Sequence, residues 1–187
     1  MIKHFIWAAS LGLLAVAGCS ERKTVNLQET NTGTGGIDAC ALLTSKEMEA
    51  IQGAPIKETK SSEQTQGGIV ISQCYFTLPT SADSIALTVI RRADGTQARG
   101  PRQLWEETFH RVEEKKIGRD GKVKEPPHPE KIDGLGDEAF WSGLQFGGTL
   151  HVLKGDYNIR ISVGGPGDTA TQVQRLKSLA EIILKRL

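Results

Sequence analysis

The sequence predicts a single α+β domain in which about three helices pack on a mostly antiparallel sheet. Segments with helical and strand periodicity follow one another in the order helix, strands, helix, strands, helix. Neighbouring strand segments are arranged as hairpins, which indicates antiparallel pairing. The regular strand–helix–strand alternation of a parallel sheet is absent, so the pattern favours helices on an antiparallel sheet.

The first helix is expected within "DACALLTSKEMEAIQG". Thr44 and Glu47 have the spacing of a capping box, and Leu43 and Met48 occupy the positions of a hydrophobic staple. Gly53 suits the left-handed conformation that commonly ends a helix. The segment therefore carries both a start and a stop signal.

A polar loop should follow, because residues 57–68, "KETKSSEQTQGG", contain only polar side chains and glycine. We predict that this loop is mobile. Strands are then expected in "GIVISQCYF" and "SIALTVIRR". The second of these alternates apolar residues on one face: Ile85, Leu87 and Val89.

The second helix is predicted over residues 101–116, since Gly100-Pro101 places a proline at the first helical position. Its apolar side would consist of Leu104, Trp105, Thr108, Phe109 and Val112. Residues 117–137 are expected to be irregular.

A hairpin is predicted from "TLHVLK" and "YNIRISV", joined by Gly155-Asp156 as a type II′ turn. Four residues of its second strand should share one face: Tyr157, Ile159, Ile161 and Val163. The last helix is predicted from about Asp168 to Arg186, with a buried side made of Val173, Leu176, Ala180, Ile183 and Leu187.

The turn before this last helix, "GPGDTA", fits the G-x-G-x-x-A pattern of dinucleotide-binding proteins. The context does not fit, because no second strand follows the helix and Pro166 removes a backbone N–H from the turn. We therefore interpret the motif as a glycine-rich turn with an Asp168 or Thr169 helix cap.

Residues 1–18 are expected to be a signal peptide, with a positive start and an apolar stretch of about a dozen residues, too short to span a bilayer. The junction that follows resembles the bacterial lipobox. Val16, Ala17 and Gly18 would be recognised by the signal peptidase, and Cys19 would receive the lipid. Permanent attachment to a membrane follows from several acyl chains.

Cleavage there would leave residues 19–36 as a flexible tether and residues 37–187 as an extracytoplasmic domain. The lost segment holds one of the 23 basic residues, so 22 basic and 22 acidic side chains would remain. This balance argues against nucleic-acid binding, which requires a basic face. The expected partners are the membrane, through the lipid, and an envelope protein or small ligand.

Two further cysteines, Cys40 and Cys74, are expected to form a disulfide, as an even pair in an exported protein usually does. The histidines lack metal-ligand spacing, and no nucleophile motif is present. We expect His110 at a surface or boundary and His151 in cross-strand packing. No cofactor and no catalytic residue is predicted.

Trp105 and Trp141 are the remaining candidates for a ligand or partner surface. Large amphipathic side chains of this kind line pockets and interfaces, but more often they fill the core of a small domain. The sequence leaves both interpretations open.

Three landmarks together resemble a group of uncharacterised bacterial lipoproteins: "DACALLTSKE", which fits D-x-C-x-L-L-T-x-x-E, then "CYF", and then "GLGDEAFW". The resemblance implies an extracytoplasmic α+β domain in which a Cys40–Cys74 bond holds the first helix to the first long strand. It transfers no catalytic residue, and it implies a structural role for Asp137.

The function expected from these observations is that of a lipid-anchored, non-catalytic binding or interaction module of the cell envelope. One alternative is an envelope enzyme with a site around Trp141, His151 and Asp137. Another is a structural or assembly accessory, which would expose a large apolar patch. Ser20 after the lipidated cysteine resembles outer-membrane sorting, on the periplasmic side, in a bacterium with two membranes. In a bacterium with one membrane, the outer face of that membrane is expected.

Overall fold

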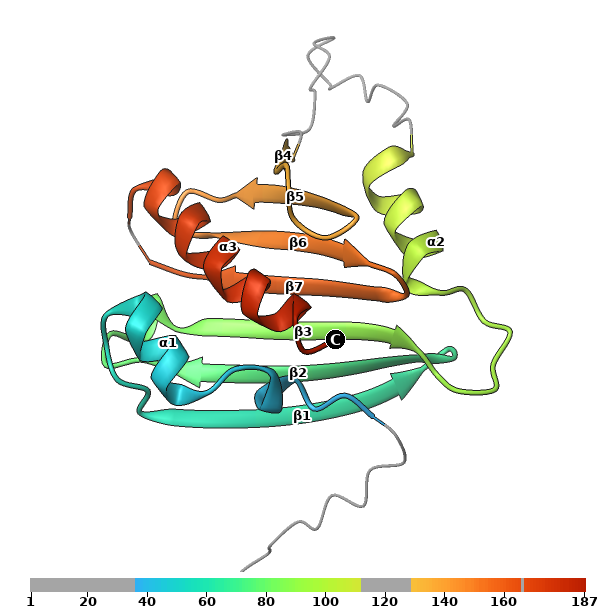
Figure 1. Cartoon of the computed structure of the whole chain (residues 1–187), viewed down its shortest axis with the longest axis horizontal. Helices are drawn as coiled ribbons and strands as arrows, with labels where there is room; N and C mark the ends of the chain where they lie inside the picture. Colours follow the sequence, from blue (N-terminus) through green and yellow to red (C-terminus); the bar gives the residue numbers. More distant parts are fainter. Residues whose placement is uncertain (1–35, 112–128, 166) are drawn as a thin grey trace, which may run out of the picture. The chain divides into compact units, whose positions relative to one another are not determined.

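The computed structural model describes residues 36–111, 129–165 and 167–187, and these form one α+β domain built on a seven-stranded antiparallel sheet (Figure 1). In chain order the elements are η1 (Ala39–Leu42), α1 (Ser45–Gln52), β1 (Glu58–Gln66), β2 (Ile69–Thr77), η2 (Ser81–Asp83), β3 (Ile85–Arg92), α2 (Pro101–Trp105), η3 (Glu106–His110), β4 (Glu130–Lys131), β5 (Glu138–Gly143), β6 (Gly148–Lys154), β7 (Tyr157–Val163) and α3 (Thr169–Leu184). The predicted fold class is confirmed. The predictions for residues 1–35, which include the signal peptide and Cys19, lie outside the described residues.

The strand order is β1-β2-β3-β7-β6-β5-β4. Two antiparallel meanders, β1 to β3 and β4 to β7, therefore meet where β3 pairs with β7 in the middle of the sheet. Leu87 of β3 lies opposite Ile161 of β7, and both side chains are fully buried. The connection between the meanders runs through α2.

One face of the sheet is covered by η1, α1 and α3 (Figure 1). Strand alternation directs every second residue to this face, where it meets the apolar sides of the helices. The α3 helix contributes Leu176, Leu179, Ala180 and Ile183, of which only Leu179 was not predicted. Across this layer the fully buried side chains from the strands include Ile85, Leu87, Leu150, Val152, Ile159 and Ile161.

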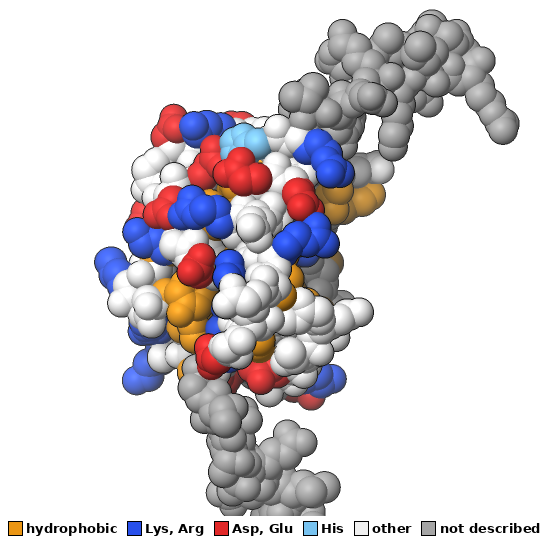
Figure 2. Space-filling model, turned by 90° about the vertical axis from the view of Figure 1, so that its right-hand side faces the viewer, with side chains coloured by type: hydrophobic (Ala, Val, Ile, Leu, Met, Phe, Trp, Pro, Cys, Tyr) orange, Lys and Arg blue, Asp and Glu red, His pale blue; other side chains and the backbone are white. Residues whose placement is uncertain are grey.

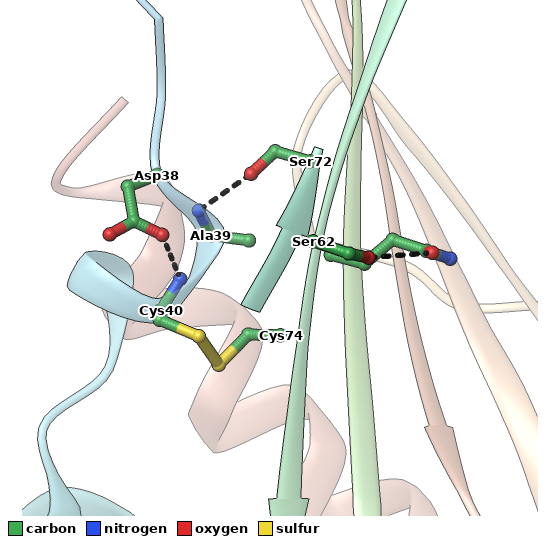
Figure 3. Close-up of a disulfide and its surroundings, with 7 residues drawn as sticks. Asp38, Ala39, Cys40, Ser62, Ser72 and Cys74 are labelled. Atoms are coloured by element: carbon green, nitrogen blue, oxygen red, sulfur yellow. Dashed lines mark hydrogen bonds between the residues drawn. A yellow bond between two sulfur atoms is a disulfide. The ribbon is translucent and has the colours of Figure 1, made fainter. Parts of the chain in front are cut away.

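The Cys40–Cys74 disulfide is present and joins η1 to β2, as predicted (Figure 3). Nearby, the buried Ser72 hydroxyl accepts a hydrogen bond of 3.0 Å from the backbone N–H of Ala39. The carboxylate of Asp38 caps the same turn by accepting from the N–H of Cys40 at 2.9 Å. The first residues of the domain are thus attached to the sheet by covalent and polar contacts.

The predicted loop at 57–68 is wrong. Residues 58–66 form the nine-residue edge strand β1, which pairs along its length with β2 through a turn at Gly67 and Gly68. All nine side chains are exposed, so the strand shows no apolar alternation. The strand is held by backbone pairing to β2. A prediction that uses only the polarity of the side chains does not detect this pairing.

The bounds of some other helices and strands also differ from the predicted ones. The second helix begins at Pro101 as predicted, but it changes to a π-helical turn, η3, that ends at His110; Val112 and residues 117–128 lie outside the described residues. Strand β5 was not predicted. The hairpin of β6 and β7 is confirmed, with φ of 54° at Gly155.

Candidate functional site

The second face of the sheet is covered only in part, by α2 and η3 packed over β3, β7, β6 and β5. Phe140 of β5 and His151 of β6 point to this face, because they alternate with the core residues Ala139, Trp141 and Leu150. The helical segment lays an aromatic pair, Trp105 and Phe109, onto them. The ring of Phe109 is stacked on Phe140 with centroids 4.8 Å apart.

Trp105 and Trp141, the two tryptophans proposed above as a ligand surface, lie on opposite faces of the sheet. Trp105 is 0 % exposed under α2, and Trp141 is 3 % exposed in the layer below α3. Neither indole therefore offers an open surface to a partner.

Glu138 is the polar centre of the second face. Its Oε2 accepts a hydrogen bond of 2.6 Å from the indole N–H of Trp105 and lies 2.7 Å from Nε2 of His110. These contacts connect the start of β5 to both α2 and η3. They give the buried indole N–H the acceptor that it needs.

The same contacts change the ionisation of the pair. Hydrogen bonding to Glu138 raises the pKa of His110 above its usual value. Burial alone would raise the pKa of Glu138, but the hydrogen bonds from His110 and Trp105 outweigh burial and lower that pKa. Both shifts favour the charged forms, an imidazolium at His110 and a carboxylate at Glu138.

His151 behaves in the opposite way. Burial, with a smaller contribution from the nearby Arg160 charge, lowers the pKa of His151 to about 4. Its ring meets the ring of Phe109 edge to face, with centroids 5.1 Å apart. The side chain is thus a neutral packing group, and its aromatic contact is with η3 rather than across the strands as expected.

The hydrogen bonds of His110 and Glu138 connect the helical segment to the sheet. A histidine beside a carboxylate can act as a general base, but no described serine, threonine or cysteine forms a hydrogen bond with His110. Within the described residues no group of three or more metal-ligating side chains occurs. The geometry instead fits attachment of the α2–η3 segment to the sheet.

Asp137 has a structural role at the adjoining turn. Its carboxylate accepts from the backbone N–H of Gly155 at 2.9 Å and from Arg102 at 2.8 Å, and Lys154 lies 3.5 Å away. The Gly155 N–H contributes most to the lowered pKa of Asp137. The residues expected for an enzyme site, Asp137, His151 and Trp141, therefore serve three separate structural environments.

The outer surface near α2 carries basic and acidic side chains interspersed with one another (Figure 2). Of the described large hydrophobic residues, three are exposed, Tyr75, Leu144 and Phe146, and the last two share the β5–β6 turn. None of the described helices is long and apolar enough to cross a membrane.

A concave pocket of about 290 Å³ lies at the start of α3; we call it the α3 pocket. It lies where α1 ends, β2 and β7 end, and α3 begins. Its apolar lining includes Leu78, Val163 and Leu176, and its polar lining includes Gln52, Asp83, Asp168, Thr171, Gln172 and Arg175. The volume is close to the lower limit for small-ligand sites.

Two opposite charges line the α3 pocket without pairing with each other. Arg175 of α3 and Asp83 of η2 form no ion pair with any described residue. The side-chain nitrogen of Gln52 is also buried and has no hydrogen-bond acceptor within the described part of the chain. The pocket thus has one cation, Arg175, and two carboxylates, Asp83 and Asp168, of which Asp168 is used to cap α3.

The glycine-rich turn forms one wall of this pocket. A Cβ at Gly164 would lie 2.5 Å from the carbonyl oxygen of Ala82, so glycine permits β7 to end directly against η2. Asp168 caps α3 by accepting from the N–H of Thr171 at 2.8 Å. The helix-cap interpretation of this motif is therefore confirmed.

Sequence reasoning did not identify the α3 pocket. Arg175 and Asp83 are separated by 92 positions and come to line one pocket only through the β3–β7 pairing and the return of α3. The one available signal was the glycine-rich turn, which marks a close approach of two backbone segments.

The α+β fold and the α3 pocket define a domain with a candidate small-ligand site. Comparison of the chain with protein-family models, with curated proteins and with solved structures gave no match.

Proposed function

We propose that this chain is a lipid-anchored, non-catalytic binding module of the bacterial cell envelope, and that the α3 pocket binds a small molecule carrying both a positive and a negative charge. The lipobox-like junction at Cys19 and the resemblance to bacterial lipoproteins support the anchor. On this proposal the protein faces the periplasm from the outer membrane when its host has two membranes.

The observation that carries the ligand class is that Arg175 and Asp83 line one pocket and neither forms an ion pair with a described residue. A zwitterion would place its anionic group at Arg175 and its cationic group at Asp83, where each charge gains a partner. Burial against Leu78 and Leu176 would strengthen these contacts by removing water from around them. A ligand of a single charge would satisfy only one side of the pocket.

The ligand part is tested by thermal unfolding of the purified full chain with a panel of free amino acids, which are small zwitterions. At least one should raise the melting temperature saturably. Arg175→Ala and Asp83→Asn should each weaken its apparent affinity about tenfold or more, since each removes a charged partner. Lys177→Ala, a change on the same helix outside the pocket lining, serves as the matched control.

The ligand proposal would be wrong if no amino acid stabilised the protein, or if Lys177→Ala weakened binding as much as Arg175→Ala. The anchor is tested separately in a bacterial host that is fed an alkyne-bearing fatty acid. The wild-type chain should take up the label and Cys19→Ala should not; labelling that survives this substitution would contradict the anchor.

A further inference from the structure

The turn between β5 and β6 exposes two large apolar side chains. Leu144 is 72 % exposed and Phe146 is 63 % exposed, and only Gln145 separates them in the sequence. Residues 139–153, which include the turn and most of both strands, contain no Asp, Glu, Lys or Arg. The tip of this hairpin can therefore lose its water without burying a formal charge of the hairpin itself.

The backbone of the turn is fixed against the sheet. The N–H of Leu144 donates a hydrogen bond of 2.9 Å to the carbonyl oxygen of Gly147. Gly147 has a φ of 98°, and a Cβ at this position would overlap the carbonyl oxygen of Val163 in β7. Leu144 and Phe146 are therefore presented outward by a turn that needs little further ordering on binding.

The two side chains are too small to form a stable protein interface by themselves. Together they expose about 300 Å² of apolar surface, whereas stable protein interfaces bury about 1,200–2,000 Å². Tyr75, the other exposed large hydrophobic residue of the described chain, does not enlarge the patch, because its strand β2 lies four strand positions from β5. A contact of this size is effective only where a second link keeps the partner close.

We propose that the β5–β6 turn inserts Leu144 and Phe146 into the surface of the bilayer that holds the anchor. Apolar side chains gain free energy at the boundary between headgroups and acyl chains, while the Gln145 amide can stay among the headgroups. Insertion is shallow, because backbone N–H and C=O groups of a turn lack partners in hydrocarbon. The contact rests on the anchor proposed at Cys19, which supplies the second link.

The predicted tether is long enough for this contact. Ile37 lies at the opposite end of β6 from the turn, since it lines a pocket together with Asp156 and Tyr157. The seven residues of β6 separate the two ends by about 23 Å. Residues 20–36, the part of the tether after Cys19, span at most about 58 Å when fully extended. The anchor and the turn can therefore reach the same surface.

The contact would orient the domain on the membrane. The β5–β6 turn and the start of α3 lie at the same end of the sheet (Figure 1). Val163, whose carbonyl oxygen adjoins Gly147, also lines the α3 pocket. The docked domain thus holds the α3 pocket at its membrane-facing end.

Fluorescence quenching on vesicles tests the contact independently of lipidation. The full chain, with Cys19→Ala and an amino-terminal histidine tag, is captured on phosphatidylethanolamine–phosphatidylglycerol vesicles that contain a nickel-chelating lipid. Gln145→Cys then supplies the one free thiol for an environment-sensitive fluorophore, since Cys40 and Cys74 form the disulfide. Emission of the label should shift to shorter wavelength, and lipids that carry a nitroxide near the headgroup should quench it.

Asp156→Cys provides the matched labelling site. Asp156 is also exposed in a hairpin turn, but it lies at the other end of β6, next to the start of the described domain. A label there should show neither the wavelength shift nor the quenching. Equal quenching at both sites would reflect only the capture of the chain at the vesicle and would overturn the proposal, as would the absence of quenching at residue 145.

A double variant tests whether the two apolar side chains make the contact. Leu144→Ser with Phe146→Ser should abolish the quenching at residue 145, whereas Tyr75→Ser, at an exposed site on another strand, should leave it unchanged. Quenching that survives the double variant would contradict the proposal. A wavelength shift that appears without vesicles and increases with protein concentration would show that a second copy covers the turn, and would also contradict it.

Failure of the turn contact and failure of the anchor give different results. Fatty-acid labelling at Cys19 without quenching at residue 145 would refute the turn contact and leave the anchor standing. Quenching at residue 145 without fatty-acid labelling would support the turn contact and refute only the anchor.

Discussion

Glu138 connects one strand to two positions of the helical segment that crosses the second face of the sheet. Its Oε2 contacts both the buried indole of Trp105 and the ring of His110, of which 42 % of the side chain is exposed. The helical pattern predicted a surface or boundary position for His110, but it did not identify the partner of this residue. Glu138 is 28 positions away and reaches His110 only because β5 lies under η3.

The two described histidines should titrate far apart. His110 should titrate above 6.5 because its pKa is raised by Glu138, whereas His151 should titrate near 4 because it is buried. Histidine ring signals followed by NMR against pH measure both values in one experiment. Glu138→Gln should lower the pKa of His110 and leave that of His151 unchanged.

The linked effect on stability has a definite sign. Since the folded-state pKa of His110 is above its unfolded value and that of Glu138 is below its own, the His110–Glu138 pair stabilises the fold fully between about pH 4.5 and about pH 6.5. This contribution is lost as pH rises through the folded-state pKa of His110. The free energy of unfolding, measured by urea denaturation, should therefore decrease over this pH range in the wild-type chain and should not show this decrease in Glu138→Gln. An unchanged His110 titration in Glu138→Gln would contradict the assignment.

At the scale of single elements, helix α1 combines a local cap with a distant ion pair. The Thr44 hydroxyl accepts from the N–H of Glu47 at 3.3 Å, and the Glu47 carboxylate accepts from the N–H of Thr44 at 2.8 Å. Arg186 then binds both oxygens of Glu47, at 2.6 Å and 2.9 Å, which ties the C-terminal end of the chain to α1. The cap was predictable from spacing, whereas the Arg186 contact was not.

Thr44→Ala should lower the free energy of unfolding by about 1 kcal/mol, because it removes the cap hydroxyl from the first turn of α1. Urea denaturation measures the change. Ser45→Ala is the matched control, since Ser45 is the next residue, is exposed and forms no hydrogen bond with a described side chain. Equal losses in the two variants would show that the cap contributes nothing of its own.

Strand β1 was predicted to be a loop because of its side chains. Its sequence, from Glu58 to Gln66, is entirely polar, and polar runs are usually loops. The strand lies at the edge of the sheet with both faces exposed, where charged residues such as Lys60 also discourage pairing with other chains. Backbone pairing with β2 along all nine residues holds this polar segment in the sheet.

For the molecule as a whole, the disulfide is the main covalent restraint within the described residues. It joins positions 34 residues apart and attaches η1 to the sheet. Replacing both residues, as Cys40→Ala with Cys74→Ala, should lower the free energy of unfolding by about 3.5 to 4 kcal/mol, because the unfolded chain regains the freedom of that loop. Urea denaturation under oxidising conditions measures this loss.

A reducing agent provides the internal control. It should destabilise the wild-type chain by a similar amount and leave the double variant unchanged. If the reducing agent destabilised the wild-type chain and the double variant equally, the Cys40–Cys74 disulfide would not be the source of the stabilisation.

The sequence by itself determined the fold class, most of the helices and strands, the capping of α1 and the pairing of Cys40 with Cys74. These features depend on local spacing, on apolar alternation or on cysteine count, all of which are present in the chain before it folds. Tertiary structure alone decided strand β1, the Glu138 contacts and the α3 pocket. Each of these depends on segments far apart in sequence, which only the β3–β7 pairing and the return of α3 bring together.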